Sequence, residues 1–237
     1  MADLKYKRIL LKISGEALAK PEGFGIDAHK VQKLAERIKG VKEMGAEVAV
    51  VTGAGNIWRG NIGMEQGMDR ATADYMGMVA TALNGLALQD ALERLGVETR
   101  MQTAIEMKEV AEPYIRRRAI RHLEKGRVVI LSCGTGNPFF TTDTAGALRA
   151  MELDADLLVK ATKVDGIYDS DPFKNPSAQR FSHLTYQKAL DLGVRVMDLT
   201  AFTLCMDNNL PIIVTNLWHE NSIEGVLSGQ EIGTLVS

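Results

Sequence analysis

A glycine- and threonine-rich segment at residues 134–143 has the composition of an anion-binding loop. It follows an apolar stretch, residues 127–132, that predicts a buried strand, and it leads into a helix expected to begin near Asp143. Glycines let the backbone approach a ligand closely, Thr141 and Thr142 are candidate N-cap residues, and the free N–H groups of a first helical turn attract anions. An ordinary strand-to-helix turn would have the same composition, so this segment alone does not decide between the two.

Three further loops lie where expected strands end. They are Ser14-Gly15 after residues 7–13, residues 53–56 after residues 47–52, and residues 162–171 after residues 157–161. In a mostly parallel sheet the carboxyl ends of the strands share one edge, and ligands bind there. Four such loops predict a site for more than one phosphate group.

Four cationic side chains lie close to these strand ends: Lys12, Arg59, Lys160 and Lys163. Phosphoryl transfer passes through a loose transition state whose negative charge is stabilised by fixed cations and backbone donors. A single cation in such a place is more often a solvated surface charge. Their recurrence at successive strand ends favours phosphoryl transfer.

The common nucleotide-binding motifs are missing. The sequence has no Gly-Lys dipeptide, which excludes a Walker A loop and with it the adenylate-kinase-like P-loop enzymes. Gly53 and Gly55 lack the third glycine of a dinucleotide-binding fingerprint, and the protein-kinase signatures are absent. Asp169 and Asp171 resemble the start of a calcium loop, but Phe173 stands at the third ligand position, so we interpret this segment as a surface loop.

Composition narrows the class of protein. The 28 basic and 30 acidic residues nearly cancel, so we expect a small-molecule ligand rather than nucleic acid or a membrane surface. Only Cys133 and Cys205 are present, and the four histidines lack metal-ligand spacing, so we expect neither a disulfide framework nor a metal held by the protein. No segment reaches the roughly 18 apolar residues of a membrane helix or resembles a signal peptide, which predicts a cytoplasmic protein.

Strand and helix signals alternate, which predicts an α/β fold with a mostly parallel central sheet and helices on both faces. Further strands are expected at residues 97–101, at residues 211–215 and near Thr234, and helices after Asp27, at residues 72–95, 113–125, 185–192 and 198–208, and from Asp143. Met76, Val79, Leu83 and Leu86 recur at helical spacing, and we interpret this stripe as core. Without a linker or repeat, the 237 residues are expected to form a single domain.

Six segments resemble, in order and spacing, the motifs of the bacterial uridylate (UMP) kinases. They are residues 12–18, 53–60, 74–78, 134–143, 161–166 and 196–199 (KISGEAL, GAGNIWRG, DYMGM, GTGNPFFTTD, ATKVDG and VMDL). The resemblance covers nearly the whole chain. It implies the amino-acid kinase fold and a cytoplasmic, generally hexameric enzyme of pyrimidine nucleotide biosynthesis. This enzyme would make UDP and ADP from UMP and ATP, with Mg²⁺ held mainly by the phosphates.

The resemblance also implies roles for individual residues. Those implied for catalysis are Lys12, Arg59, Asp143 and Lys160. Those implied for ATP binding are Lys12, Ser14, Gly15, Gly55, Arg59, Thr162, Tyr168 and Asp171. Those implied for UMP binding are Ala54, Asp74, Thr135, Gly136, Asn137, Pro138, Phe139, Phe140, Thr141 and Thr142. Residues 1–160 would then hold mainly UMP, and residues 161–237 mainly ATP.

The implied roles of the two aspartates make chemical sense. Asp74 suits the sugar of UMP, because a carboxylate accepts two hydrogen bonds at once. The alternative is an acid in the first turn of its helix, near Thr72, stabilised by the helix dipole. Asp143 would orient the catalytic lysines rather than act as a base, since an already charged phosphate oxygen needs little deprotonation.

Several positions depart from the family pattern. Ala54 replaces a glycine, so its backbone must adopt a conformation that a Cβ permits. Cys133 replaces the usual alanine, and we interpret it as a small buried apolar residue rather than a catalytic thiol.

Gln89 and Glu93 stand where some relatives place basic residues that respond to GTP. Arg100 and Arg127 remain as candidate effector residues, so we expect a weak or altered response to GTP, with UTP as a second candidate effector. Two alternatives stay open: an enzyme of the same fold acting on a carboxylate or carbamate, and a non-catalytic nucleotide-binding protein. The loop at residues 137–140 and Asp74 argue against the first, because together they supply a nucleotide-sized second site. The joint presence of Lys12, Arg59 and Asp143 argues against the second.

Overall fold

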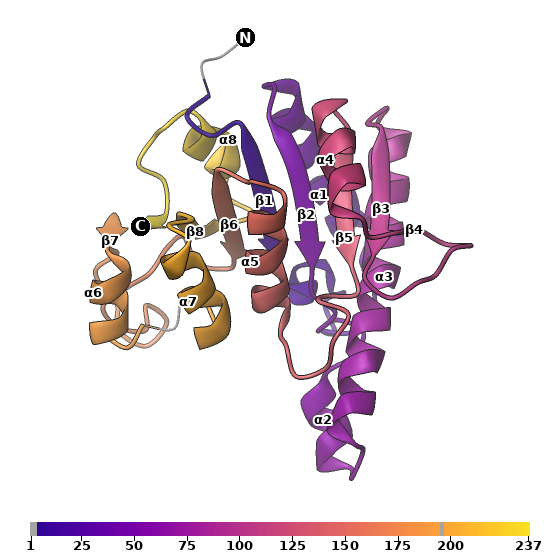
Figure 1. Cartoon of the computed structure of the whole chain (residues 1–237). Helices are drawn as coiled ribbons and strands as arrows, with labels where there is room; N and C mark the ends of the chain where they lie inside the picture. Colours follow the sequence, from indigo (N-terminus) through magenta and orange to yellow (C-terminus); the bar gives the residue numbers. More distant parts are fainter. Residues whose placement is uncertain (1–3, 195–196) are drawn as a thin grey trace.

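One nine-stranded sheet organises the chain, which the computed structural model describes at residues 4–194 and 197–237. The strands lie in the order β4-β3-β5-β2-β1-β6-β8-β9-β7 (Figure 1). Their bounds are β1 Arg8–Ile13, β2 Glu47–Thr52, β3 Thr99–Thr103, β4 Glu112–Pro113, β5 Val128–Ser132, β6 Leu157–Thr162, β7 His183–Leu184, β8 Ile212–Asn216 and β9 Thr234–Val236. Neighbouring strands are parallel except for β8 and β9, which confirms the predicted mostly parallel sheet.

Helices cover both faces of this sheet. Their bounds are η1 Gly15–Leu18 (a 3₁₀ helix), α1 Ala28–Glu43, α2 Gly60–Glu65, α3 Arg70–Arg94, α4 Arg116–Glu124, α5 Thr142–Glu152, α6 Tyr186–Asp191, α7 Leu199–Asp207 and α8 Ser222–Leu227. Helices α1, α3 and α8 contribute to the apolar layer on one face, and α4 to α7 contribute to the layer on the other. In Figure 1, α4, α5 and α7 lie in front of the strands. The α/β fold expected from the sequence is thereby confirmed.

Strand β1 shows why the central strands are apolar along their length. Ile9, Leu11 and Ile13 are fully buried in the layer with α1 and α3, whereas Leu10 is buried in the layer with α5. Because successive side chains point to opposite faces, a strand covered on both faces needs apolar residues at almost every position. Lys12 departs from this pattern, and its side chain belongs to the candidate site.

Helix starts follow local capping signals. The side chain of Asp27 accepts hydrogen bonds from the backbone N–H groups of His29 and Lys30 at the start of α1, as predicted. Helix α3 begins at Arg70, earlier than expected, because Asp69 caps it by accepting the N–H of Thr72.

The apolar stripe of α3 is not part of the core. Met76, Val79, Leu83 and Leu86 are exposed, so their interpretation as core residues is wrong. The helix instead packs against the sheet through its opposite face, where Leu88 and Leu92 are fully buried. Gly85 lies so close to the sheet there that a Cβ would be 2.5 Å from the hydroxyl oxygen of Ser132. Helical spacing indicates that a face is apolar, but not which face meets the sheet.

Other helix and strand boundaries also differ from those expected from the sequence. Strand β3 begins two residues later than expected, and α4 begins at Arg116 rather than Pro113 because β4 pairs with β3 just before it. The short elements η1, α2, β4, β7 and α8 were not expected. None of these five segments carries an apolar pattern long enough to distinguish it from a loop.

The four predicted loops meet at the carboxyl edge of β1, β2, β5 and β6. Gly15 is required there, because a Cβ would lie 2.7 Å from the carbonyl oxygen of Gly53 and from the amide nitrogen of Gly55. The backbone of Ala54 has no positive φ, as its Cβ requires. Cys133 is fully buried with φ of 64°, which agrees with its interpretation as a small apolar residue. Among the described residues, no helix is long and apolar enough to cross a membrane.

Candidate active site

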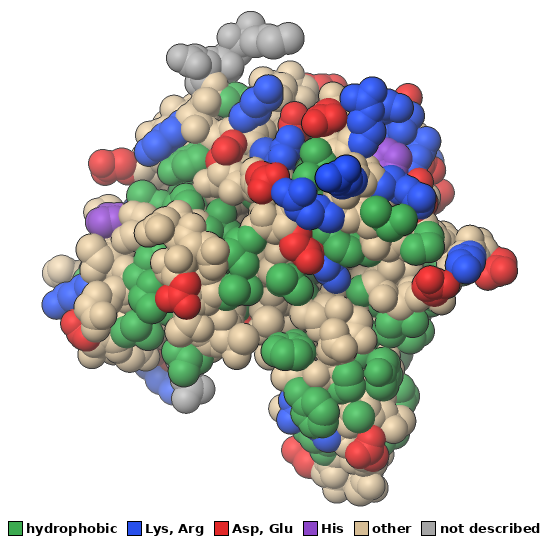
Figure 2. Space-filling model, viewed as in Figure 1, with side chains coloured by type: hydrophobic (Ala, Val, Ile, Leu, Met, Phe, Trp, Pro, Cys, Tyr) green, Lys and Arg blue, Asp and Glu red, His purple; other side chains and the backbone are tan. Residues whose placement is uncertain are grey.

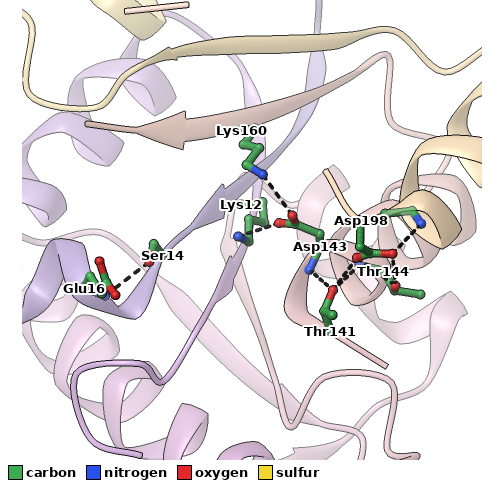
Figure 3. Close-up of polar contacts among 9 residues, drawn as sticks. Lys12, Ser14, Glu16, Thr141, Asp143, Thr144, Lys160 and Asp198 are labelled. Atoms are coloured by element: carbon green, nitrogen blue, oxygen red, sulfur yellow. Dashed lines mark hydrogen bonds and ion pairs between the residues drawn. The ribbon is translucent and has the colours of Figure 1, made fainter. Parts of the chain in front are cut away.

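Two largely buried lysines share one carboxylate at the carboxyl edge of the sheet (Figure 3). Lys12 on β1 and Lys160 on β6 are register partners on adjacent strands, so their side chains leave the sheet on the same face. The carboxylate of Asp143, in the first turn of α5, lies 2.5 Å from the Lys12 ammonium and 2.9 Å from that of Lys160. The structure therefore brings together three of the four residues that the resemblance implied for catalysis.

Electrostatics keep this cluster charged. Burial alone would raise the pKa of Asp143, but the ammonium groups of Lys12 and Lys160 lower it by more, so its net pKa lies below its ordinary value. Burial lowers the pKa of Lys160, and the neighbouring Asp143 carboxylate opposes that effect. A carboxylate that is difficult to protonate is a poor general base. It is well suited to hold two cations in fixed positions.

A second carboxylate, Asp198, joins the starts of two helices. It caps α7 by accepting the N–H of Ala201, and it also accepts hydrogen bonds from the hydroxyl groups of Thr141 and Thr144 on α5. The Thr141 hydroxyl in turn accepts the N–H of Asp143 at 3.0 Å. Asp198 thus helps to fix Asp143. The sequence analysis gave this residue no role of its own, and Val196, the first residue of the same motif, lies outside the described residues.

A pocket of about 210 Å³ opens beside the cluster. It is lined by Ala54, Gly55, Trp58, Gly60, Ala73, Asp74, Gly77, Met78, Thr81, Gly134, Phe140, Thr141 and Thr142. Five of the residues implied for UMP binding are among them. Met78 and Thr81 follow Asp74 at helical spacing, a signal that could have identified them from the sequence.

The remaining residues implied for UMP binding do not line this pocket. Thr135 and Asn137 form hydrogen bonds with one another, which hold the turn at the start of the loop. The Phe139 side chain is exposed, and its backbone φ of 73° lies in the left-handed region. These residues shape the loop, while Phe140, Thr141 and Thr142 contact the pocket.

Asp74 ties this loop to α3. Its Oδ2 atom accepts the Phe139 backbone N–H at 2.8 Å and a hydrogen bond from Arg70 Nε at 2.9 Å. The Arg70 guanidinium also lies 5.6 Å from the centre of the Phe139 ring. Because α3 begins at Arg70, Asp74 lies beyond the first turn, so its alternative interpretation as a first-turn acid near Thr72 is wrong. Asp74 lines the pocket, and its Oδ1 atom takes part in neither of these two hydrogen bonds.

The other strand-end cations form a separate, exposed cluster. The Glu16 carboxylate, at the start of η1, lies 2.9 Å from the Arg59 guanidinium and 3.4 Å from the Lys163 ammonium. Arg59 also donates to the carbonyl oxygen of Gly55, so the loops after β1, β2 and β6 are joined here. The Ser14 hydroxyl accepts the Glu16 N–H at 3.3 Å. Arg59 is thus placed apart from the buried lysine cluster.

Three residues implied for ATP binding, Thr162, Tyr168 and Asp171, form hydrogen bonds within their own segment of the chain. The Thr162 hydroxyl donates to the carbonyl oxygen of Val164, and the Tyr168 hydroxyl donates to Asp165 at 2.6 Å. Asp171 accepts the N–H of Phe173 at 3.0 Å. Thr162 ends β6, and Tyr168 and Asp171 lie in the loop after it, but none of these bonds joins them to the phosphate-facing loops.

The candidate effector arginines lie at the opposite, amino-terminal edge of the sheet. Arg127 precedes β5 and lies 2.8 Å from the Glu98 carboxylate, whose pKa it lowers. Arg100 on β3 lies 3.9 Å from Glu93. The structure brings both arginines near Glu98, and both are already close to carboxylates.

Comparison with known proteins gives one consistent result. Residues 7–216 match the amino acid kinase family. A UMP kinase from Bacillus anthracis is 39% identical with a TM-score of 0.95, over 98% of this chain and 96% of that one. A UMP kinase from Ureaplasma parvum is 41% identical with a TM-score of 0.92, over 98% of this chain and 99% of that one. A uridylate kinase from Archaeoglobus fulgidus is 26% identical with a TM-score of 0.75, over 97% of this chain and 99% of that one.

Proposed function

The chain belongs to the amino acid kinase family, and on that premise we propose that it is a UMP kinase, which makes UDP and ADP from UMP and ATP. The observation that carries this proposal is the pair of largely buried lysines around Asp143, which lies beside a pocket lined by the loops after β2 and β5 and by α3. The similarity of the whole chain to two UMP kinases supports the same conclusion.

We place UMP in the 210 Å³ pocket, with its sugar at Asp74 and its phosphate toward Lys12. The Oδ1 atom of Asp74 would accept hydrogen bonds from the ribose hydroxyls, while Oδ2 keeps the loop at Phe139 in place. Residues 1–160 would hold mainly UMP, and residues 161–237 mainly ATP, through Thr162, Tyr168 and Asp171.

The chemistry follows from fixed positive charge. An oxygen of the UMP phosphate attacks the γ-phosphorus of ATP, and the bond from that phosphorus to the β–γ bridging oxygen breaks. Lys12 and Lys160 would stabilise the charge on the transferred group, and Asp143 would hold both ammonium groups in place without taking a proton. Arg59 would contact the ATP phosphates from the loop after β2.

Mg²⁺ accompanies ATP in the proposed reaction. Within residues 4–194 and 197–237, no group of three or more His, Cys, Asp or Glu side chains is arranged to hold a metal ion. Asp143 is already paired with two lysines. We therefore propose that the phosphates of ATP hold the ion chiefly, as they commonly hold Mg²⁺ in kinases. When bound, the ion would offset the negative charge of the phosphoryl group.

A panel of acceptors tests this function. ADP release from MgATP is measured with UMP, CMP, AMP and GMP, and with a carboxylate and a carbamate acceptor. We expect turnover with UMP well above that with the other acceptors. Equal turnover of CMP and UMP would contradict uracil recognition by the pocket, and turnover of a carboxylate or carbamate alone would establish the alternative activity.

We also propose that copies of the chain assemble through the exposed stripe of α3. Tyr75, Met76, Val79, Leu83 and Leu86 are between 36% and 50% exposed. Figure 2 shows hydrophobic side chains gathered over α2 and the neighbouring part of α3. A contiguous apolar face of this kind is typical of a protein–protein interface. Light scattering should give a homo-oligomer, with a hexamer as the expected size, and a monomeric mass would contradict this proposal.

Effector binding at Arg100 and Arg127 is a further part of the proposal. Glu93 and Glu98 already lie beside these arginines, and a carboxylate next to a triphosphate weakens its binding. We therefore expect only weak activation by GTP, and the same assay tests UTP. Strong GTP activation that survives Arg100→Ala and Arg127→Ala would place the effector elsewhere.

A further inference from the structure

Two clusters with the same pattern of charges lie at the carboxyl edge of the sheet. In each, a single carboxylate lies between two cations that come from different strand-end loops or strands. Asp143 lies between Lys12 and Lys160, with side chains 12% to 18% exposed. Glu16 lies between Arg59 and Lys163, with side chains 41% to 70% exposed. The clusters therefore share a pattern of charges, but they differ in burial, and only the exposed one contains a guanidinium.

Burial determines which carboxylate can leave its partners. Removing a carboxylate from a buried pair of cations leaves uncompensated charge in a poorly solvated place, which is strongly unfavourable. An exposed ion pair contributes little, because water solvates both groups when they separate. Asp143 is thus fixed, whereas Glu16 can exchange with another anion at small cost.

The position of Glu16 suggests which anion replaces it. Its carboxylate lies close to the Gly55 loop, since a Cβ on Gly55 would be 3.6 Å from Glu16 Cγ. Arg59 donates to the Gly55 carbonyl oxygen as well as to Glu16. A planar guanidinium and an ammonium around one anion also match the recognition of phosphate.

We propose that Glu16 is an internal substitute for a phosphate group of ATP. Its carboxylate holds Arg59 and Lys163 in place when no nucleotide is bound, and the polyphosphate chain displaces it on binding. The inference rests on the proposed function, because it takes the anion to be the polyphosphate of ATP. A triphosphate offers more oxygens and more charge than one carboxylate, so exchange favours the nucleotide.

The proposal predicts an effect of metal on affinity. Once displaced, Glu16 remains close to the bound polyphosphate, and two like charges there repel one another. Mg²⁺ on the phosphates would reduce that repulsion. Removing the charge of Glu16 should therefore strengthen the binding of metal-free ATP more than that of MgATP.

Calorimetric titration of three proteins tests the proposal: wild type, Glu16→Gln and the control Glu22→Gln. Glu22 shares a hollow with Arg59 and is exposed, but within the described chain it forms no ion pair. The probes are inorganic tripolyphosphate and ATP, both with a chelator, and MgATP. We expect Glu16→Gln to bind the metal-free probes roughly three- to tenfold more tightly, as loss of two exposed ion pairs implies, and the control to change less than about twofold.

The proposal would be overturned if Glu16→Gln bound the metal-free probes no more tightly than the wild type, or if Glu22→Gln gained as much affinity as Glu16→Gln. It would also be overturned if neither the wild type nor Glu16→Gln bound tripolyphosphate. If circular dichroism shows that Glu16→Gln is not folded, Glu16→Asp withdraws the carboxylate by one methylene, and it should give a smaller gain. Absence of UDP formation by the wild type would contradict the proposed function. A working kinase whose Glu16 variant binds like the wild type would contradict this inference alone.

Discussion

Asp143→Asn should destabilise the fold and lower turnover while leaving the binding of UMP nearly unchanged. The substitution keeps the size of the side chain but removes the charge that lies 2.5 Å from Lys12 and 2.9 Å from Lys160. Two ammonium groups on adjacent strands then remain without their shared counter-charge. Asp74 and the other pocket residues that we propose to hold the sugar are unchanged.

The expected cost follows from burial. Breaking a buried ion pair by removing one partner costs about 3–5 kcal/mol. Here the side chains keep 12% to 18% exposure, and Lys160 can release its proton, so we expect a loss of about 2–4 kcal/mol in the free energy of unfolding. Turnover should also fall, because the lysines lose their fixed positions. The KM for UMP should change little.

The pH dependence gives an independent check of the same reasoning. In the wild type, the pKa of Asp143 is lower when folded, so its contribution to stability is present above its ordinary value and is lost as pH falls through the folded pKa. In Asp143→Asn, the folded pKa of Lys160 should fall further, while the unfolded chain still binds that proton. Stability of the variant should therefore rise with pH between the lowered folded pKa and about 10.4, the unfolded value.

Urea unfolding near neutral pH and at about pH 9, at one fixed protein concentration, measures these effects. Asp154→Asn is the matched control, because Asp154 pairs with Arg116 at the surface and its loss should cost less than about 1 kcal/mol. Steady-state kinetics completes the comparison. Wild-type stability and turnover in Asp143→Asn would refute the role of this carboxylate. Loss of UMP binding with normal turnover would make it a substrate-binding residue instead.

Three further substitutions probe other parts of the site and fold. Lys12→Ala should lower kcat by roughly 10²- to 10³-fold, as loss of one fixed charge-stabilising group does, and near-normal turnover would remove Lys12 from the mechanism. In the wild type we expect the preference for UMP over dUMP to be worth about 1–3 kcal/mol, and Asp74→Ala should reduce it. If the ratio of kcat/KM for UMP to kcat/KM for dUMP is unchanged in the variant, Asp74 does not contact the sugar. Gly85→Ala places a Cβ 2.5 Å from Ser132 Oγ and 2.6 Å from Met101 Sδ, so it should destabilise by about 1–3 kcal/mol, and an unchanged urea midpoint would contradict the close packing of α3 on β5.

Local signals were sufficient to predict much of the fold. Asp27 and Thr141 cap their helices through bonds to residues two or three positions ahead. The sequence therefore identified Asp27 and limited the cap of α5 to Thr141 or Thr142, of which the structure selects Thr141. The alternation of strands and helices likewise gave the parallel sheet. The apolar stripe around Val79 was misjudged because its burial depends on what covers it, and periodicity carries no such information.

The candidate site was predicted less completely, because it depends on contacts between distant segments. The resemblance to UMP kinases implied that Asp143 orients lysines, but only strand order makes Lys12 and Lys160 register partners. Asp198 lies more than 50 residues from Thr141, and no local pattern connects them. Met78 could have been predicted as a pocket residue, because it lies one helical turn beyond Asp74 on the same helix.

We propose that the lysine cluster catalyses the transfer of the γ-phosphoryl group from ATP to UMP. The most direct measurement follows label from γ-labelled ATP in single-turnover reactions of the wild type and Lys12→Ala, with UMP as acceptor. We predict label in UDP for the wild type, formed at least about 10²-fold more slowly by Lys12→Ala. Label released only as inorganic phosphate, or equal rates of UDP formation in the two proteins, would contradict the claim.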